Sequence, residues 1–230
     1  IQIDMLFAAL LAWSWLAWLG GYLLLREHHP GAVPGEHRRW FLKAYFWLAL
    51  AFLAKGPLAP VLSVLVLAAF LAWQRDFAVL RRAGIVAGLS ITLLLVAPWY
   101  VAAGLKGGAH YAYELIIFQN FQRATHAWDH IQPWWRYFEY LLGDFFPWVI
   151  LLPALALHLR RERRLGVPAQ RFLLVAFAVP FVFLSAVQSK QGKYLLMSYP
   201  FLALLLGDLS RRMEGARVRR LGLLLAAGLA

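Results

Sequence analysis

The chain has 230 residues, of which 62% are hydrophobic and only 15% charged, and its mean hydropathy is +0.62. Soluble domains contain about 45–50% apolar and about 25% charged residues, so this composition excludes an ordinary soluble enzyme or binding module. The net charge of +12 leaves two classes open, a membrane protein with basic loops or an insoluble nucleic-acid binder.

Long apolar runs predict an all-α, polytopic membrane helical bundle. In chain order they are Met5–Leu25, Phe41–Ala54, Leu58–Trp73, Ala83–Ala103, Tyr137–Leu157, Phe172–Gln188 and Tyr194–Leu209, with a partial run from Leu221. A helix needs about 20 apolar residues to cross a bilayer, so the shorter runs are expected to recruit flanking residues or to line a cavity. We predict a single integral membrane domain over residues 1–230, with about seven spans plus the partial one.

The two ends of the chain suggest a fragment of a longer protein. The chain begins at Ile1 without an initiator Met, and it ends inside the apolar run Leu221–Ala230. No basic stretch precedes the first run, so a cleavable signal is not expected. Cysteine is absent, which excludes disulfides, thiolate metal ligands and a cysteine nucleophile within this chain.

The placement of the basic residues decides between the two classes. If the runs alternate across a membrane, four connections share one side: Arg26–Lys43, Gln74–Arg82, His158–Arg171 and Ser210–Arg220. These connections hold 17 of the 23 Lys and Arg residues, and the other side holds 6. This asymmetry is the one that the positive-inside rule predicts, with the arginine-rich loops in the cytoplasm. The nucleic-acid interpretation is therefore unnecessary.

The connection on the outer side, and the run that follows it, are rich in aromatic residues. Between Tyr111 and Trp148 lie 13 of the chain's 36 aromatic residues, where a uniform distribution would place about six. An aromatic belt at headgroup level explains most of this enrichment. The stretch Tyr111–Arg123 also mixes polar and apolar residues at helical spacing, which predicts a helix lying in the outer interface.

One carboxylate and several cations are expected at this outer side. Asp4 opens the first run, Lys55 stands in the turn Lys55-Gly56-Pro57, Lys190 and Lys193 flank another turn, and Arg123 ends the interfacial stretch. Ionisable residues at the end of a span are costly unless they are paired, solvated or functional. Structural alternatives remain open, because each lysine could be a snorkelling anchor and Asp4 a helix cap.

Taken together, the outer cations are suited to a phosphate held at headgroup depth. A polyprenyl-phosphate sugar donor fits, since its tail stays in lipid while its phosphate requires cations. The acceptor hydroxyl then needs a carboxylate to orient or deprotonate it. His126 and His130, near Asp129, are only a weak metal signal, so no cofactor is assigned and a divalent metal is left open.

Several short strings give the chain a resemblance to bacterial protein-mannosyltransferase-like glycosyltransferases, a GT-C family that includes the aminoarabinose transferase acting on lipid A. The strings are Phe52–Leu58, Ala97–Tyr100, Asn120–Arg123, Gln132–Tyr137, Phe146–Trp148 and Ser189–Leu196 followed by Tyr199-Pro200. They occur in the family's order and span nearly all of this chain, which would correspond to the central part of such an enzyme.

The resemblance implies a GT-C-like fold with an extracytoplasmic interfacial helix or loop, in a bacterial inner membrane. It implies an inverting glycosyltransferase that moves a sugar from a polyprenyl-phosphate donor to a lipid, glycan or protein acceptor of the envelope. Asp4 resembles the family's second acidic position and is the catalytic candidate. Lys55, Arg123, Lys190, Lys193 and Tyr194 would correspond to positions that bind the donor phosphate. The family's best-known catalytic acid would lie upstream of Ile1, so the fragment alone is expected to be inactive.

Two other functions compete with this interpretation. A transporter or channel segment would place ionisable residues within its spans, and Glu139 and Asp144 fit that pattern weakly. A non-catalytic membrane subunit would need no chemistry at all. An acidic residue in the upstream outer loop would favour the transferase.

Overall fold

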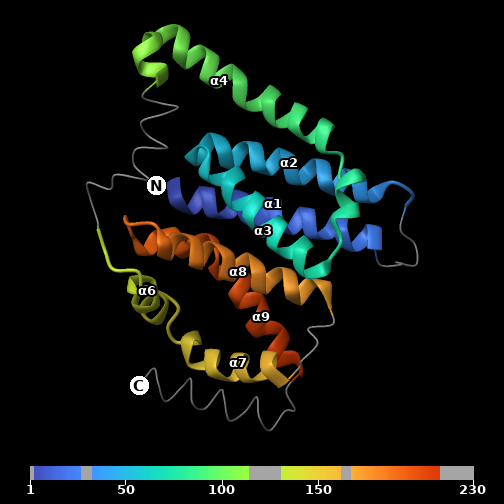
Figure 1. Cartoon of the computed structure of the whole chain (residues 1–230), viewed down its shortest axis with the longest axis vertical. Coiled ribbons are helices and arrows are strands. Elements are labelled where there is room, and N and C mark those ends of the chain that lie inside the picture. Colours follow the sequence, from blue (N-terminus) through green and yellow to red (C-terminus); the bar gives the residue numbers. More distant parts are fainter. Residues whose placement is uncertain (1–2, 27–32, 114–130, 162–166, 213–230) are drawn as a thin grey trace.

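The structure is a computed structural model, and it describes residues 3–26, 33–113, 131–161 and 167–212. These residues form helices and turns, and their only β-type pairing is an isolated bridge between Ile131 and Ser189. The all-α prediction is therefore confirmed for the described part of the chain. Figure 1 shows α1, α2, α3 and α8 lying side by side, with α4 outermost against α2.

The helices follow the predicted runs closely at the start of the chain. They are α1 (Ile3–Arg26), α2 (Glu36–Lys55), α3 (Leu58–Gln74), η1 (Phe77–Arg81), α4 (Ile85–Tyr113), α6 (Arg136–Asp144), η3 (Trp148–Leu151), α7 (Leu152–Arg161), α8 (Pro168–Ala186), η4 (Gly192–Met197) and α9 (Tyr199–Arg212). The partial run from Leu221 lies outside the described residues, as does the predicted interfacial helix beyond Tyr113.

Within the described residues, three helices are long and apolar enough to cross a membrane: α1, α4 over Ile85–Gly108, and α8. The pair Arg136–Asp144 and Trp148–Leu157 counts as a fourth only if it is taken as one broken span, because its halves meet at 109°. The predicted run Tyr137–Leu157 therefore forms two helical segments with a sharp bend between them, not one straight helix. Pro147 lacks a backbone N–H and disfavours helical backbone at Phe146, so the helix ends before this dipeptide.

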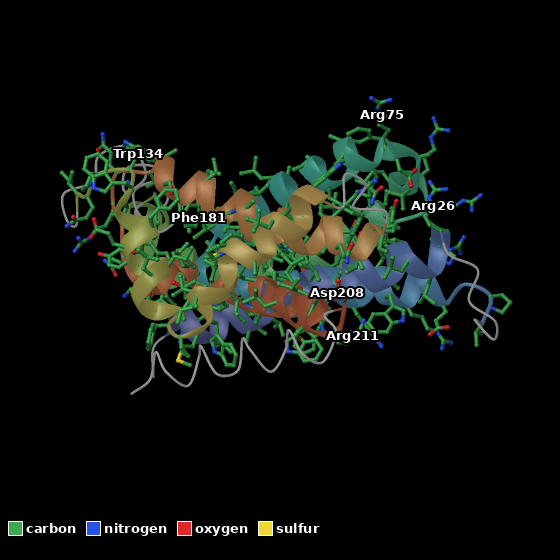
Figure 2. All side chains as sticks on the ribbon, turned by 90° about the horizontal axis from the view of Figure 1, so that it is seen from below. Arg26, Arg75, Trp134, Phe181, Asp208 and Arg211 are labelled. Atoms are coloured by element: carbon green, nitrogen blue, oxygen red, sulfur yellow. The ribbon has the colours of Figure 1, made fainter. Side chains whose placement is uncertain are left out.

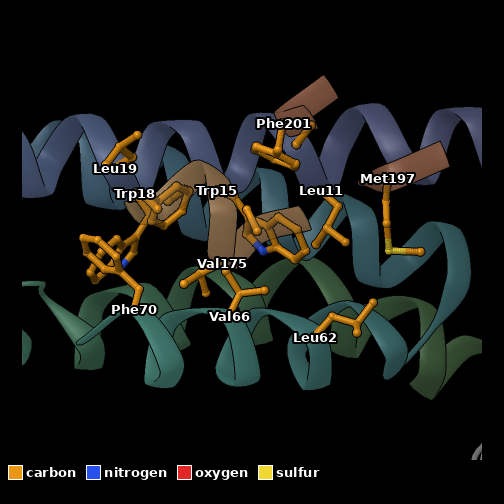
Figure 3. Close-up of a cluster of buried hydrophobic side chains, with 14 of the residues drawn as sticks. Leu11, Trp15, Trp18, Leu19, Leu62, Val66, Phe70, Val175, Met197 and Phe201 are labelled. Atoms are coloured by element: carbon orange, nitrogen blue, oxygen red, sulfur yellow. The ribbon is translucent and has the colours of Figure 1, made fainter. Parts of the chain in front are cut away.

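Aromatic side chains fill the centre of the bundle. Trp15 and Trp18 of α1 are buried, and Trp18 contacts the rings of Phe70 on α3 and Phe172 on α8. The indole N–H of Trp15 donates to the Ser63 hydroxyl at 2.8 Å, so this buried donor is satisfied. Figure 3 shows these α1 side chains packed against those of α3. These contacts fix the position of α1 relative to α3 and α8.

The helices sort the charged and aromatic residues to opposite ends of the molecule. Figure 2 shows Arg26 and Arg75 at one end and Trp134 at the other. At the first end, named here the arginine end, Arg26 pairs with Asp76, and Tyr22 donates to the same carboxylate at 3.3 Å. The start of α1, the end of α2 and η4 lie at the opposite end, named here the site end. The first three helices therefore alternate in direction, as the charge asymmetry predicts.

Candidate functional site

Three ionisable side chains predicted to lie on one membrane side come together at the site end. Asp4 lies in the first turn of α1, Lys55 is the last residue of α2, and Lys193 lies in η4. The ammonium of Lys55 pairs with Asp4 Oδ1, and the Nζ of Lys193 lies 3.3 Å from Asp4 Oδ2. A single carboxylate is thus shared between two lysines from different elements.

The local structure explains why these side chains meet. The turn from α2 to α3 needs Gly56, whose φ of 73° is unfavourable for residues with a Cβ, and its N–H bonds to the carbonyl of Phe52. This places Lys55 at the helix C-terminus, where a cation interacts favourably with the helix dipole. The carboxylate of Asp4 also interacts favourably with a helix dipole, because it lies at the N-terminus of α1. Helix η4 packs against α1 and brings Lys193 to the pair.

Burial makes the cluster asymmetric. The side chain of Asp4 is only 8% exposed, whereas those of Lys55 and Lys193 are 22% and 38% exposed. The carboxylate is the most buried of the three groups, and both lysine side chains keep part of their surface exposed. With one negative and two positive groups, the cluster carries a net positive charge. It is therefore suited to bind an anion.

Aromatic rings hold the ammonium of Lys55. Its Nζ lies 4.3 Å from the centroid of the Tyr194 ring and 5.4 Å from that of Phe7. Such cation–π contacts stabilise a partly desolvated cation by about 0.5–2 kcal/mol. Tyr194, which was predicted to bind the donor phosphate, therefore lies beside Lys55, another of the predicted phosphate ligands. Phe7 was not predicted, although its position three residues after Asp4, one helical turn away, is a signal that could have identified it.

Lys190 has different surroundings from the other lysines. Its side chain is nearly fully buried, and its ammonium donates to the backbone carbonyls of Val187 and, at 3.2 Å, Gln132. Burial lowers the pKa of this lysine. The bonds tie the segment before α6 to the turn after α8, beside the bridge at Ser189. An ammonium has three donors, so one remains for a ligand.

Several predicted residues cannot be placed. Arg123 lies outside the described residues, as do His126, Asp129 and His130. Within the described ranges, no three His, Asp or Glu side chains gather in a way that could hold a metal ion. The site that can be built therefore consists of Asp4, Lys55, Lys193 and Tyr194, with Lys190 supporting the turn before η4.

Comparisons with known proteins point to one group. No family model matches the chain. It is 33% identical over 178 residues to the undecaprenyl phosphate-alpha-4-amino-4-deoxy-L-arabinose arabinosyl transferase of Shewanella sediminis, covering 76% of this chain and 32% of that protein. A transferase of the same name from Pseudomonas fluorescens is 32% identical over 161 residues, covering 69% of this chain and 28% of that protein. The chain thus spans about a third of the length of these relatives.

The fold agrees with a solved structure. The crystal structure of ArnT from Cupriavidus metallidurans bound to undecaprenyl phosphate matches with a TM-score of 0.80 at 24% identity. The match covers 99% of this chain and 41% of that one. The apo structure of the same protein matches with a TM-score of 0.78. The predicted GT-C-like membrane bundle is therefore confirmed as the fold.

Proposed function

The chain is a homologue of the undecaprenyl phosphate-aminoarabinose transferases and has the GT-C membrane fold of ArnT, and from this premise we propose that its parent protein is a membrane glycosyltransferase. The donor is a sugar linked to undecaprenyl phosphate or a similar polyprenyl phosphate. The acceptor is a hydroxyl of an envelope lipid, glycan or protein. The observation that carries the proposal is the sharing of one buried carboxylate, Asp4, between two partly exposed lysines at one end of the bundle.

The cluster suits the charge changes of such a transfer. The acceptor oxygen attacks the anomeric carbon, the bond from that carbon to the phosphate oxygen breaks, and the acceptor loses its proton. The leaving polyprenyl phosphate gains one negative charge, which Lys55 and Lys193 would stabilise. Asp4 would accept the proton or orient the acceptor hydroxyl. Tyr194 would keep the Lys55 ammonium directed toward the phosphate.

Two predicted phosphate ligands have separate roles in this proposal. Arg123 would add a third cation, from the connection that follows α4. Lys190 would act mainly as a positioning residue, because its ammonium already donates to two backbone carbonyls, and its remaining N–H would face the phosphate. No metal is required by this scheme, and a divalent ion would be an additional counter-charge.

We propose that the site end faces outward from a bacterial inner membrane. The support is the asymmetry of charge: 17 of the 23 Lys and Arg residues belong to connections assigned to the arginine end. Arginine-rich loops remain on the cytoplasmic side. A donor whose phosphate sits at the outer leaflet would then meet Lys55 and Lys193 at headgroup depth.

The proposal is tested on the full-length protein in lipid nanodiscs, with an undecaprenyl-phosphate aminoarabinose donor and a lipid A acceptor. Lys55→Met is expected to lower the transfer rate at least 100-fold, because a leaving phosphate loses a charge-assisted partner worth about 2.7 kcal/mol or more. Lys106→Met is the control, since Lys106 is an exposed lysine on α4 outside the cluster. Normal transfer by Lys55→Met, with wild-type membrane insertion, would reject the phosphate role of this lysine.

A further inference from the structure

A second polar group lies at the site end, around the last residue of α6. Asp144 accepts a hydrogen bond from the Tyr199 hydroxyl at 3.2 Å, and no Lys, Arg or His of the described ranges pairs with it. A carboxylate at a helix C-terminus is disfavoured by the helix dipole by about 0.3–1 kcal/mol. The charge of Asp144 therefore does not serve the stability of α6.

Tyr137 adds a buried hydroxyl without a partner. Its residue is fully buried, and its hydroxyl lies close to the backbone of Gln191 but makes no hydrogen bond of normal geometry within the described residues. It lies near the hydroxyl of Tyr194 and near that of Tyr199, the partner of Asp144. Leaving such a group unpaired costs about 1–3 kcal/mol. The Tyr137 hydroxyl therefore leaves an unmet hydrogen-bonding requirement close to the Asp144–Tyr199 pair.

Gly192 connects this group to the lysine cluster. A Cβ at Gly192 would lie 3.0 Å from Asp144 Oδ2 and 3.4 Å from the Tyr140 ring, so the absence of a side chain lets the carboxylate pack closely against η4. The next residue, Lys193, reaches Asp4. Successive α-carbons are about 3.8 Å apart. Two neighbouring residues of η4 thus lie beside the two polar groups, Gly192 beside Asp144 and Lys193 in the proposed phosphate site.

We propose that Asp144, with Tyr199 and Tyr137, binds the protonated amino group of an amino-sugar donor whose phosphate is held by Lys55 and Lys193. The proposal rests on the proposed function: the relatives' names already give a 4-amino-4-deoxy sugar, and the new element is the residue that would bind its amine. In a 4-amino-4-deoxy pyranose the anomeric carbon, C1, and the amine-bearing C4 lie on opposite sides of the ring. A donor of this kind needs cations near its phosphate and an anion near its amine. Lys55 and Lys193 would supply the cations, and Asp144 would supply the anion.

A purely structural role for Asp144 makes a different prediction. If the carboxylate only fastens α6 to the start of α9, an amide in its place still accepts the hydrogen bond from Tyr199. Asp144→Asn therefore keeps the geometry and removes only the charge. Glu139→Gln is the matched control, because Glu139 is a half-exposed carboxylate on the same helix that pairs with Arg136 one turn away.

The experiment measures binding to the full-length protein in nanodiscs, so that it does not depend on turnover. The ligands are undecaprenyl phosphate, its 4-amino-4-deoxyarabinose ester, and the same ester with the amine converted to a neutral formamide. The wild type and Glu139→Gln are expected to bind the amino donor about tenfold more tightly than the formamide donor. Asp144→Asn is expected to abolish this preference while its dissociation constant for undecaprenyl phosphate stays unchanged.

Each other outcome separates the two proposals. A wild type that binds both sugar donors equally, or an Asp144→Asn variant that keeps the preference, would overturn the role of Asp144. A variant that weakens all three ligands alike would show that Asp144 supports the fold alone. Failure of the wild type to bind undecaprenyl phosphate would instead reject the proposed function.

Discussion

Replacing Asp4 by Asn should have opposite effects on donor binding and on sugar transfer. Asp4 is the shared counter-charge of Lys55 and Lys193, and its carboxylate would lie about two hydrogen-bond lengths, roughly 6 Å, from a phosphate bound to them. Two unit charges at roughly 6 Å repel by about 2.8 kcal/mol at an effective dielectric constant of about 20. Because both lysines are partly exposed, solvent reduces this value to about 1.4 kcal/mol, or tenfold in the dissociation constant.

Asp4→Asn is therefore expected to bind undecaprenyl phosphate about tenfold more tightly while losing most of its transfer activity. The first effect follows from removal of a negative charge beside the phosphate, and the second from loss of the group that would accept the proton of the acceptor hydroxyl or orient that hydroxyl. Titration of the full-length protein in nanodiscs measures the first, and a single-turnover assay measures the second. The variant should also lose about 1–3 kcal/mol of stability, since two lysines are left without their counter-charge.

Asp76→Asn provides the control for this prediction. Asp76 also pairs with a cation and accepts from a tyrosine, but it lies at the arginine end. Its replacement should lower stability without tightening the binding of undecaprenyl phosphate. Weaker or unchanged phosphate binding by Asp4→Asn would refute the competition between carboxylate and phosphate. Full transfer activity would refute a catalytic role for Asp4.

Two further predictions concern stability. Lys190→Met should lower the free energy of unfolding by about 1–3 kcal/mol, because two backbone carbonyls lose a buried donor; an unchanged melting temperature in detergent would contradict this. Gly88→Ala should cost about 1–3 kcal/mol, since its Cβ would lie 2.2 Å from the Tyr45 ring and force α4 away from α2. Gly207→Ala, with no atom within 4 Å of the new Cβ, should leave the melting temperature equal or higher.

The positions of the helices could be predicted because hydropathy is a local property of the chain. The run Met5–Leu25 became α1 (Ile3–Arg26), and the short pair around Gly56 became α2 and α3. The break in Tyr137–Leu157 was missed because the run remains apolar through Phe146-Pro147. Hydropathy shows where the chain is apolar. It does not show whether the helix continues, which the backbone restrictions of proline determine.

The gathering of charges at one end could be predicted, but their pairing could not. Lys190 and Lys193 stand three residues apart in one turn, and nothing in the local sequence separates them. The tertiary structure does, because the backbone bends into η4 between them, burying Lys190 on two carbonyls and leaving Lys193 to reach Asp4. Pairings of this kind depend on which elements pack against the turn.

The sharing of Asp4 also explains how such a site can be stable before a substrate binds. Two partly buried lysines facing one phosphate site would repel each other, and each would pay a desolvation cost if left alone. Asp4 supplies their counter-charge as the most buried of the three groups, and both lysine side chains keep part of their surface exposed. In the proposed site, the carboxylate that stabilises the two lysines is therefore the same one that would weaken phosphate binding. Such an arrangement would lower the affinity for the donor in exchange for a folded site, and it would release the phosphate product more readily for the same reason.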